Sequence, residues 1–98
     1  MYDEALGEVL AQKSIRTLSR YQNKLAHLYP EQYFNAYQGL IFPFAEKEMG
    51  RRHYQEAVSY LKRMKEIEGF KGEVQEIVER LREENKKKPA FIDEMKEL

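Results

Sequence analysis

The sequence contains no cysteine and no tryptophan, and only three prolines and five glycines interrupt its 98 residues. Without cysteine the chain can form no disulfide, no thiolate metal site and no thiol nucleophile. A chain free of cysteine suits the reducing cytoplasm, where we expect this protein to be found. Without tryptophan, the large side chains of the core must come from its seven tyrosines and five phenylalanines.

The chain also lacks a long apolar run and an excess of charge of either sign. No apolar run approaches the roughly 20 residues that a bilayer-spanning helix needs, so we expect no membrane insertion. The N-terminus, MYDEALGEVL, is acidic and has none of the basic-then-apolar order of a signal peptide. Seventeen basic residues balance seventeen acidic ones, so no net charge directs the protein to nucleic acid or to an anionic membrane. We therefore expect a soluble protein.

The clearest periodic pattern lies between Gly50 and Gly69. Apolar side chains recur there at the spacing of one helical face, and the two glycines mark its ends. The members of this face are Tyr54, Ala57, Val58, Leu61, Met64 and Ile67. The face is as broad as that of a core-facing helix rather than a coiled-coil seam. We interpret this segment as the central helix of a small domain.

The segment from Asp3 to Tyr29 has two apolar patches whose phases differ. The phase changes between Ala11 and Ser14. We predict one long helix with a change of face. The alternative is that Ser14 caps a second, separate helix, because serine is a preferred residue at that position.

A further helix is expected over residues 31–49. Pro43 lies inside its pattern and should kink it, because proline has no N–H and its ring crowds the carbonyl of Gly39. A true break near Phe42 is the alternative.

Two more helices are expected after the central one. Two glycines predict a turn at residues 68–72, and a new apolar pattern begins at Glu73. Pro89 should end that helix and begin a last short one. No stretch alternates as a strand does, so the sequence predicts an all-α fold. We expect a small bundle of about five helices in a single domain over residues 1–98, either a whole protein or a fragment of a longer one.

Residues 40–69 carry the small, aromatic and packing positions of a paired-helix motif. These positions are Ala45, Tyr54, Ala57, Leu61 and Met64. With them the segment resembles a helical hairpin of the tetratricopeptide type, in which an alanine lets two helices cross closely. The sequence departs from that family at Gly69, where proline is usual, and at Pro43. The resemblance implies a helical hairpin that binds another protein.

The last part of the chain, IVERLREENKKKPAFIDEMKEL, joins a charged helix, a basic run, a proline and a short apolar helix. In this order it resembles the C-terminal helical region of bacterial SWIM-type zinc-finger proteins. The zinc motif of that family needs three cysteines and a histidine, and this sequence has no cysteine. The resemblance therefore implies a fragment without the metal-binding part.

Aromatic residues gather between Tyr29 and Phe44. We expect most of them to fill the core of a chain without tryptophan. They could instead form a groove for a partner helix or peptide, because aromatic side chains dominate interface energies. Tyr33 and Tyr37, four residues apart, are the two that we expect to be partly exposed. The candidate partner-binding residues are Tyr33, Tyr37, Phe44, Arg51, Arg52 and Tyr54.

Basic residues also cluster on the central helix. They are Arg51, Arg52, His53, Lys62, Arg63 and Lys65. They could bind phosphate, but glutamates are interleaved with them from Glu46 to Glu68. A solvated charged face is therefore the preferred interpretation, and nucleic acid is disfavoured as a partner.

Motifs that would indicate catalysis are missing. The chain has only two histidines, His27 and His53, and no HExxH spacing. Glu56 lies three residues after His53 and could pair with it at the surface. No nucleophile elbow or phosphate-binding loop occurs. We expect no enzyme activity, no metal and no cofactor.

These patterns predict a cytoplasmic, non-catalytic interaction or scaffolding module. Its partner would be another protein or a second copy of the chain, bound through an apolar aromatic face. The alternative is a nucleic-acid-associated accessory domain of a larger protein.

Overall fold

The computed structural model describes residues 2–98, and these residues form six α-helices and no β-strand. The expected all-α fold is confirmed, with one helix more than the five that the sequence predicts. In chain order the helices are α1 (Tyr2–Ala11), α2 (Ile15–Leu25), α3 (Pro30–Lys47), α4 (Arg51–Lys65), α5 (Lys71–Glu84) and α6 (Pro89–Glu94).

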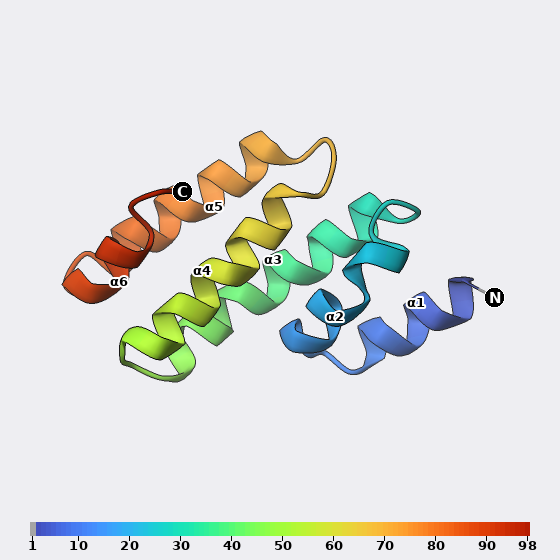
Figure 1. The fold of residues 1–98 in the computed structure, drawn as a ribbon, viewed down its shortest axis with the longest axis horizontal. Coiled ribbons are helices and arrows are strands. Elements are labelled where there is room, and N and C mark those ends of the chain that lie inside the picture. The colour runs from blue at the N-terminus through green and yellow to red at the C-terminus, as the bar shows by residue number, and fades with distance from the viewer. Residues whose placement is uncertain (1) are drawn as a thin grey trace.

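The helices make an elongated bundle of 45 × 25 × 17 Å. Figure 1 shows α3 and α4 antiparallel in its middle, with α5 and α6 beyond α4 and with α2 on α3. Helix α1 packs against α2 at the other end of the molecule. Because α4 also contacts α2, α5 and α6, it is the element that most of the bundle shares.

The predicted central helix is confirmed as α4, although it ends at Lys65, so Ile67 of the expected face lies beyond it in the following turn. All six apolar residues of its expected face are buried, and Ala57, Leu61 and Met64 are completely inaccessible. Burial of such a face is the main source of stability for a helix of this length, because an isolated helix of 15 residues is marginal in water.

The single long helix predicted over Asp3 to Tyr29 is wrong, and the alternative, a cap at Ser14, is right. The Ser14 hydroxyl accepts a hydrogen bond from the backbone N–H of Thr17 at 3.3 Å. Lys13, just before it, has a left-handed backbone with φ of 49°. The break has a packing reason: Val9 and Ile15 are both buried, and an uninterrupted helix would direct them to different sides.

Helix α3 continues through Pro43, so the alternative break near Phe42 does not occur. Proline leaves the carbonyl of Gly39 without its helical donor. Gly39 is exposed and has no neighbour within 4 Å of the position of a Cβ, so water can reach this carbonyl. The helix ends at Lys47, two residues earlier than predicted.

Glycines permit two of the connections between helices. Gly50 has φ of 112° and Gly69 has φ of 92°, values that favour glycine strongly. Gly72, which the sequence assigns to the same turn as Gly69, lies inside α5, since that helix begins at Lys71. Pro89 begins α6, as predicted.

Candidate functional site

Tyr33 and Tyr37 are wholly buried, so the expectation that they are partly exposed is wrong. Helix α2 covers the face of α3 that carries them. The hydroxyl of Tyr33 donates to the carbonyl of Leu18 at 3.1 Å, and that of Tyr37 donates to Oε1 of Gln22 at 2.6 Å. Burial raises the pKa of Tyr33 to about 12 and raises that of Tyr37 further, so both phenols stay neutral. As the molecule stands, neither side chain can touch a partner.

A chain of polar contacts continues from Tyr37 into α4. The Nε2 of Gln22 donates to the carbonyl of Arg63 at 2.6 Å. The guanidinium of Arg63 in turn donates to the hydroxyl of Ser19 at 3.2 Å. These bonds join α2, α3 and α4 in one network. Among the described residues, no buried polar side-chain atom lacks a hydrogen-bond partner.

Two of the candidates on α4 hold α6 in place. The ring of Tyr54 is buried and stacks on Phe91 with centroids 4.7 Å apart. The Nη1 of Arg51 lies 2.6 Å from a carboxylate oxygen of Glu94. Arg52 is exposed. At the start of α4, Arg51 and Arg52 are therefore exposed and Tyr54 is buried, and both Arg51 and Tyr54 attach α6.

Phe44 borders a pocket and is partly accessible. Its ring stacks on His53, with centroids 4.4 Å apart, and meets the edge of Tyr60 at 5.3 Å. The Nε2–H of His53 donates to the carbonyl of Phe44 at 2.6 Å. His53 lies near Glu48, with Nδ1 4.0 Å from Oε2, and among the described residues it forms no ion pair or hydrogen bond with Glu56, the partner that the sequence suggested. These contacts hold the Phe44 ring in one orientation.

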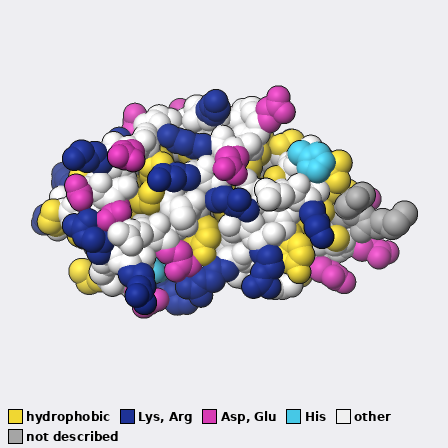
Figure 2. Space-filling model, viewed as in Figure 1, with side chains coloured by type: hydrophobic (Ala, Val, Ile, Leu, Met, Phe, Trp, Pro, Cys, Tyr) yellow, Lys and Arg dark blue, Asp and Glu magenta, His cyan; other side chains and the backbone are white. Residues whose placement is uncertain are grey.

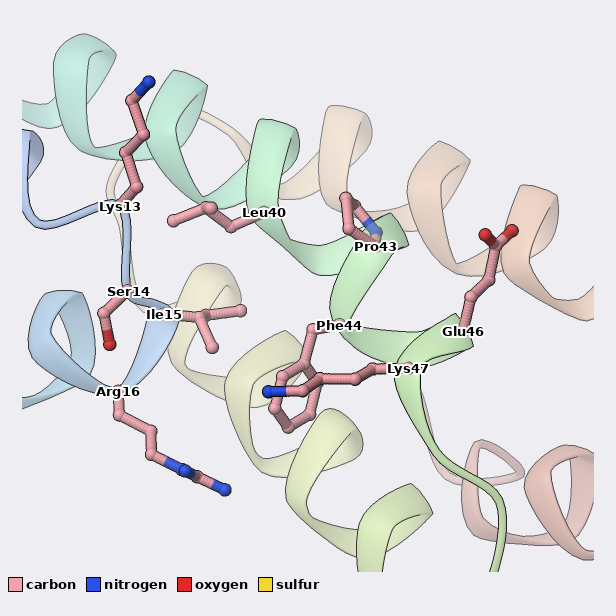
Figure 3. A pocket seen from close by; sticks show the side chains of 9 residues that line it. All are labelled: Lys13, Ser14, Ile15, Arg16, Leu40, Pro43, Phe44, Glu46 and Lys47. Carbon is pink, nitrogen blue, oxygen red and sulfur yellow. The ribbon is translucent and has the colours of Figure 1, made fainter.

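The pocket is an open groove of about 640 Å³ between the α1–α2 connection and the C-terminal half of α3. We call it the α2–α3 groove. Figure 3 shows Leu40 extending from α3 toward the α1–α2 connection and Ile15 extending toward α3, with Pro43 and Phe44 further along α3. Ile15 is buried, Leu40 and Phe44 are partly buried, and Pro43 is exposed. The floor of the groove is thus apolar and comes from two separate parts of the chain.

Charged side chains form the rim of the α2–α3 groove. Three are basic, Lys13, Arg16 and Lys47, and one, Glu46, is acidic. In Figure 3 the Lys47 amine extends across the opening, whereas the Glu46 carboxylate points away from it. Lys13 and Lys47 form no ion pair with any of residues 2–98.

Arg16 differs from the two lysines because it binds Glu56 on α4. Its Nε lies 2.7 Å from Oε2 of Glu56, and its Nη2 lies 3.2 Å from Oε1. The hydroxyl of Tyr60 donates to the same carboxylate at 2.6 Å. The bond from Arg16 and then the bond from Tyr60 lower the pKa of Glu56 to about 2. Much of the Arg16 charge is therefore compensated within the chain.

Sequence reasoning found Phe44 and missed the rest of the groove. The sequence marked each side of the groove separately, one by the phase change before Ser14 and the other by the proline at position 43. Ile15 and Leu40 are 25 positions apart in the sequence. They line the same groove only because α2 packs on α3. No spacing rule for a single helix can report such a pair.

The remaining basic candidates do not form one site. Arg63 is engaged by Ser19, and the Nζ of Lys65 donates to the carbonyl of Leu98. Figure 2 shows basic and acidic side chains interspersed over the visible face. Among residues 2–98, no three His, Cys, Asp or Glu side chains lie close enough together to hold a metal. None of the described helices is long and apolar enough to cross a membrane.

No family model matches this sequence, and comparison with curated proteins and with solved structures likewise gives no match.

Proposed function

We propose that this chain is a non-catalytic protein-interaction module that binds a segment of a partner in the α2–α3 groove. The observation that carries the proposal is the groove itself, an open apolar hollow with one rigid aromatic ring in its floor. Its volume lies within the range of about 300–1,000 Å³ that is typical of ligand sites. A space of this size accepts a few side chains of a peptide.

Preformed geometry supports binding at this place. Phe44 is held by His53 and Tyr60, and Ile15 follows the Ser14 cap. Side chains that are already fixed lose little freedom when a partner arrives, and this lowers the entropy that binding must overcome. A partner side chain between Ile15 and Leu40 would remove apolar surface from water, at about 25 cal/mol for each Å² buried.

The charges around the groove support a binding role over a catalytic one. The carboxylate of the lining residue Glu46 points away from the opening, and that of Glu56, beside the rim, is bound by Arg16 and Tyr60. With a pKa of about 2, this group is a poor general base near neutral pH, where an effective base has a pKa close to 7. The lysines of the rim are exposed and have no partner that would activate them.

A finer part of the proposal concerns the α3–α4 hairpin, which we propose to be tetratricopeptide-like. The two helices are antiparallel neighbours, and Ala45 and Ala57 are both completely buried. Small residues at such positions allow two helices to approach closely. The groove lies on the side of α3 that meets α2.

The test is a selection of binders from a random peptide library displayed on phage, followed by a comparison of variants. Peptides that bind the wild-type protein should bind Leu40→Glu at least tenfold more weakly, because a carboxylate then occupies the apolar floor. Gln38→Glu is the matched control, since it adds the same charge to an exposed position of α3 outside the groove. Pro43→Ala, at an exposed position of the floor, provides a second groove variant with little risk to folding.

Circular dichroism and thermal unfolding must first show that each variant remains folded. Light scattering over a hundredfold dilution, on the wild type and on Leu40→Glu, then shows whether the chain forms a dimer and whether that dimer depends on the groove. The proposal fails if no peptide is selected, or if the selected peptides bind Leu40→Glu and Pro43→Ala as tightly as the wild type.

A further inference from the structure

We infer that the segment bound in the α2–α3 groove is acidic and places a large aliphatic side chain on the floor between Ile15, Leu40 and Phe44. This inference rests on the proposed function and names the chemistry of the partner. It follows from the charges of the rim, which differ from the neutral balance of the whole chain.

The rim has more positive than negative charge available to a partner. Lys13 and Lys47 lie on opposite sides of the groove, one in the α1–α2 connection and the other at the end of α3. Neither forms an ion pair with a residue of the described chain. Glu46, the one acidic residue of the rim, directs its carboxylate away from the opening. The Lys13 amine also extends away from the opening, so Lys47 is the uncompensated amine that reaches over the floor. An acidic segment would be attracted by the Lys47 amine and, at the edge of the groove, by Lys13, and a basic one would meet repulsion.

The apolar floor selects the rest of the segment. Leu40 and Phe44 are one helical turn apart on α3, and Ile15 faces them from α2. The ring of Phe44 is already engaged by His53 and Tyr60, and the rest of the floor is aliphatic, so a flexible aliphatic chain matches most of the surface available. We therefore expect leucine, isoleucine or methionine at the centre of the bound segment.

A protein segment fits these features better than a nucleic acid or a membrane surface. Binding to a phosphate backbone needs several cations along a track, and this rim has two free lysines beside an apolar floor. The chain as a whole has no net positive charge to attract a polyanion. The groove is also a local hollow rather than an extended apolar face.

Two synthetic probes test the inference by fluorescence anisotropy. Both are labelled amphipathic peptides of the same length with the same leucine positions, and one carries aspartate and glutamate at every position where the other carries lysine. We expect the acidic probe to bind about tenfold more tightly than the basic one, the combined effect of a few exposed charge pairs. Raising the ionic strength from about 0.05 to about 0.5 M should remove most of this difference.

Variants of one residue locate the effect. Lys47→Glu should weaken binding of the acidic probe about tenfold and tighten binding of the basic one, because the charge that extends across the opening is reversed. Lys24→Glu makes the same change at an exposed position of α2 outside the groove. It should leave the dissociation constants of both probes within about twofold of their wild-type values.

The possible outcomes separate this inference from the proposed function. If library peptides bind in the groove but the two probes bind equally, or if the basic probe binds more tightly, the partner is not acidic and only the inference falls. Failure of both probes to bind also overturns the inference. A dimer that is lost in Leu40→Glu would assign the groove to a second copy and would overturn it as well. If the library selection itself finds no groove binder, the proposed function fails first.

Discussion

Buried tyrosines show how single residues determine this interior. Tyr33 and Tyr37 present their rings edge to face, with centroids 6.1 Å apart, and each hydroxyl reaches a group on α2. A buried phenol is tolerated when its hydroxyl is bonded, because an unpaired polar group in the core costs about 1–3 kcal/mol. The two residues that seemed best placed to meet a partner instead fasten two helices together.

Replacement of Tyr37 by phenylalanine should destabilise the protein by about 1–3 kcal/mol, because Oε1 of Gln22 loses its donor in the buried network. The free energy of unfolding from urea titration measures this change. Tyr29→Phe is the control, since its hydroxyl binds Asp3 at the surface, where water replaces a lost hydrogen bond, and its loss should lower stability less. Equal losses in the two variants would contradict the structural role given to Tyr37.

The sequence alone predicted which residues of α4 are buried but not which tyrosines of α3 are. The α4 face is periodic, so its burial follows from its own spacing. Tyr33 and Tyr37 lie in an aromatic-rich segment where several faces are apolar. Their burial depends on α2, and α2 reaches them only because the chain breaks at Ser14.

Among the elements, α2 and α4 are joined by a charged contact as well as by the buried network. Arg16 on α2 binds Glu56 on α4 through two hydrogen bonds. The contact holds the start of α2, and with it Ile15 and Ser14, at the edge of the groove. Loss of this contact should therefore affect the groove as well as stability.

Stability should fall in acid because of this contact. The pKa of Glu56 is about 2 in the folded protein and about 4.5 when unperturbed, so its ionised form favours folding. The contribution is complete above about pH 4.5 and disappears as the pH falls toward about 2. Urea titrations at a series of pH values should show this fall in the wild type.

Glu56→Gln provides the comparison, because glutamine keeps the shape and cannot titrate. The variant should be less stable than the wild type at pH 7, and the difference between them should shrink as the pH approaches 2. A difference that stays constant across this range would show that ionisation of Glu56 contributes nothing to folding.

Two glycines should respond oppositely to the same substitution. Gly39→Ala should stabilise the protein by about 0.5–1 kcal/mol, because Gly39 lies within α3 and an added Cβ meets nothing within 4 Å. Gly50→Ala should destabilise it by about 1–3 kcal/mol, because φ at this residue is 112°. Thermal unfolding of both variants checks the pair. A loss of stability in Gly39→Ala would show that the helix near Pro43 has no room for a side chain.

Most elements were predictable because each carries a local signal. Pro30 and Pro89 begin helices, and Gly50 and Gly69 permit turns. The break before α2 was left as an alternative, because serine at position 14 suits a cap but also occurs within helices. The choice is made by tertiary packing, since both α1 and α2 must bury their apolar residues.

For the whole molecule, the elongated arrangement places the groove between α2 and α3, away from α6. Its residues come from two regions that are joined only by folding, so the sequence predicted one member, Phe44, and not the site. The balanced net charge of the chain also concealed the basic rim, because composition averages over all surfaces. Local charge becomes visible only when the fold places Lys13, Arg16 and Lys47 around one groove.

The most direct test of the account is a titration of isotope-labelled protein with the acidic probe peptide, followed by backbone amide chemical shifts. The account predicts saturable shifts that centre on Ile15, Leu40 and Lys47 and that disappear in Leu40→Glu. The account is contradicted if the amides of the groove do not move, or if the shifts centre instead on the exposed apolar residues Tyr21 and Leu28.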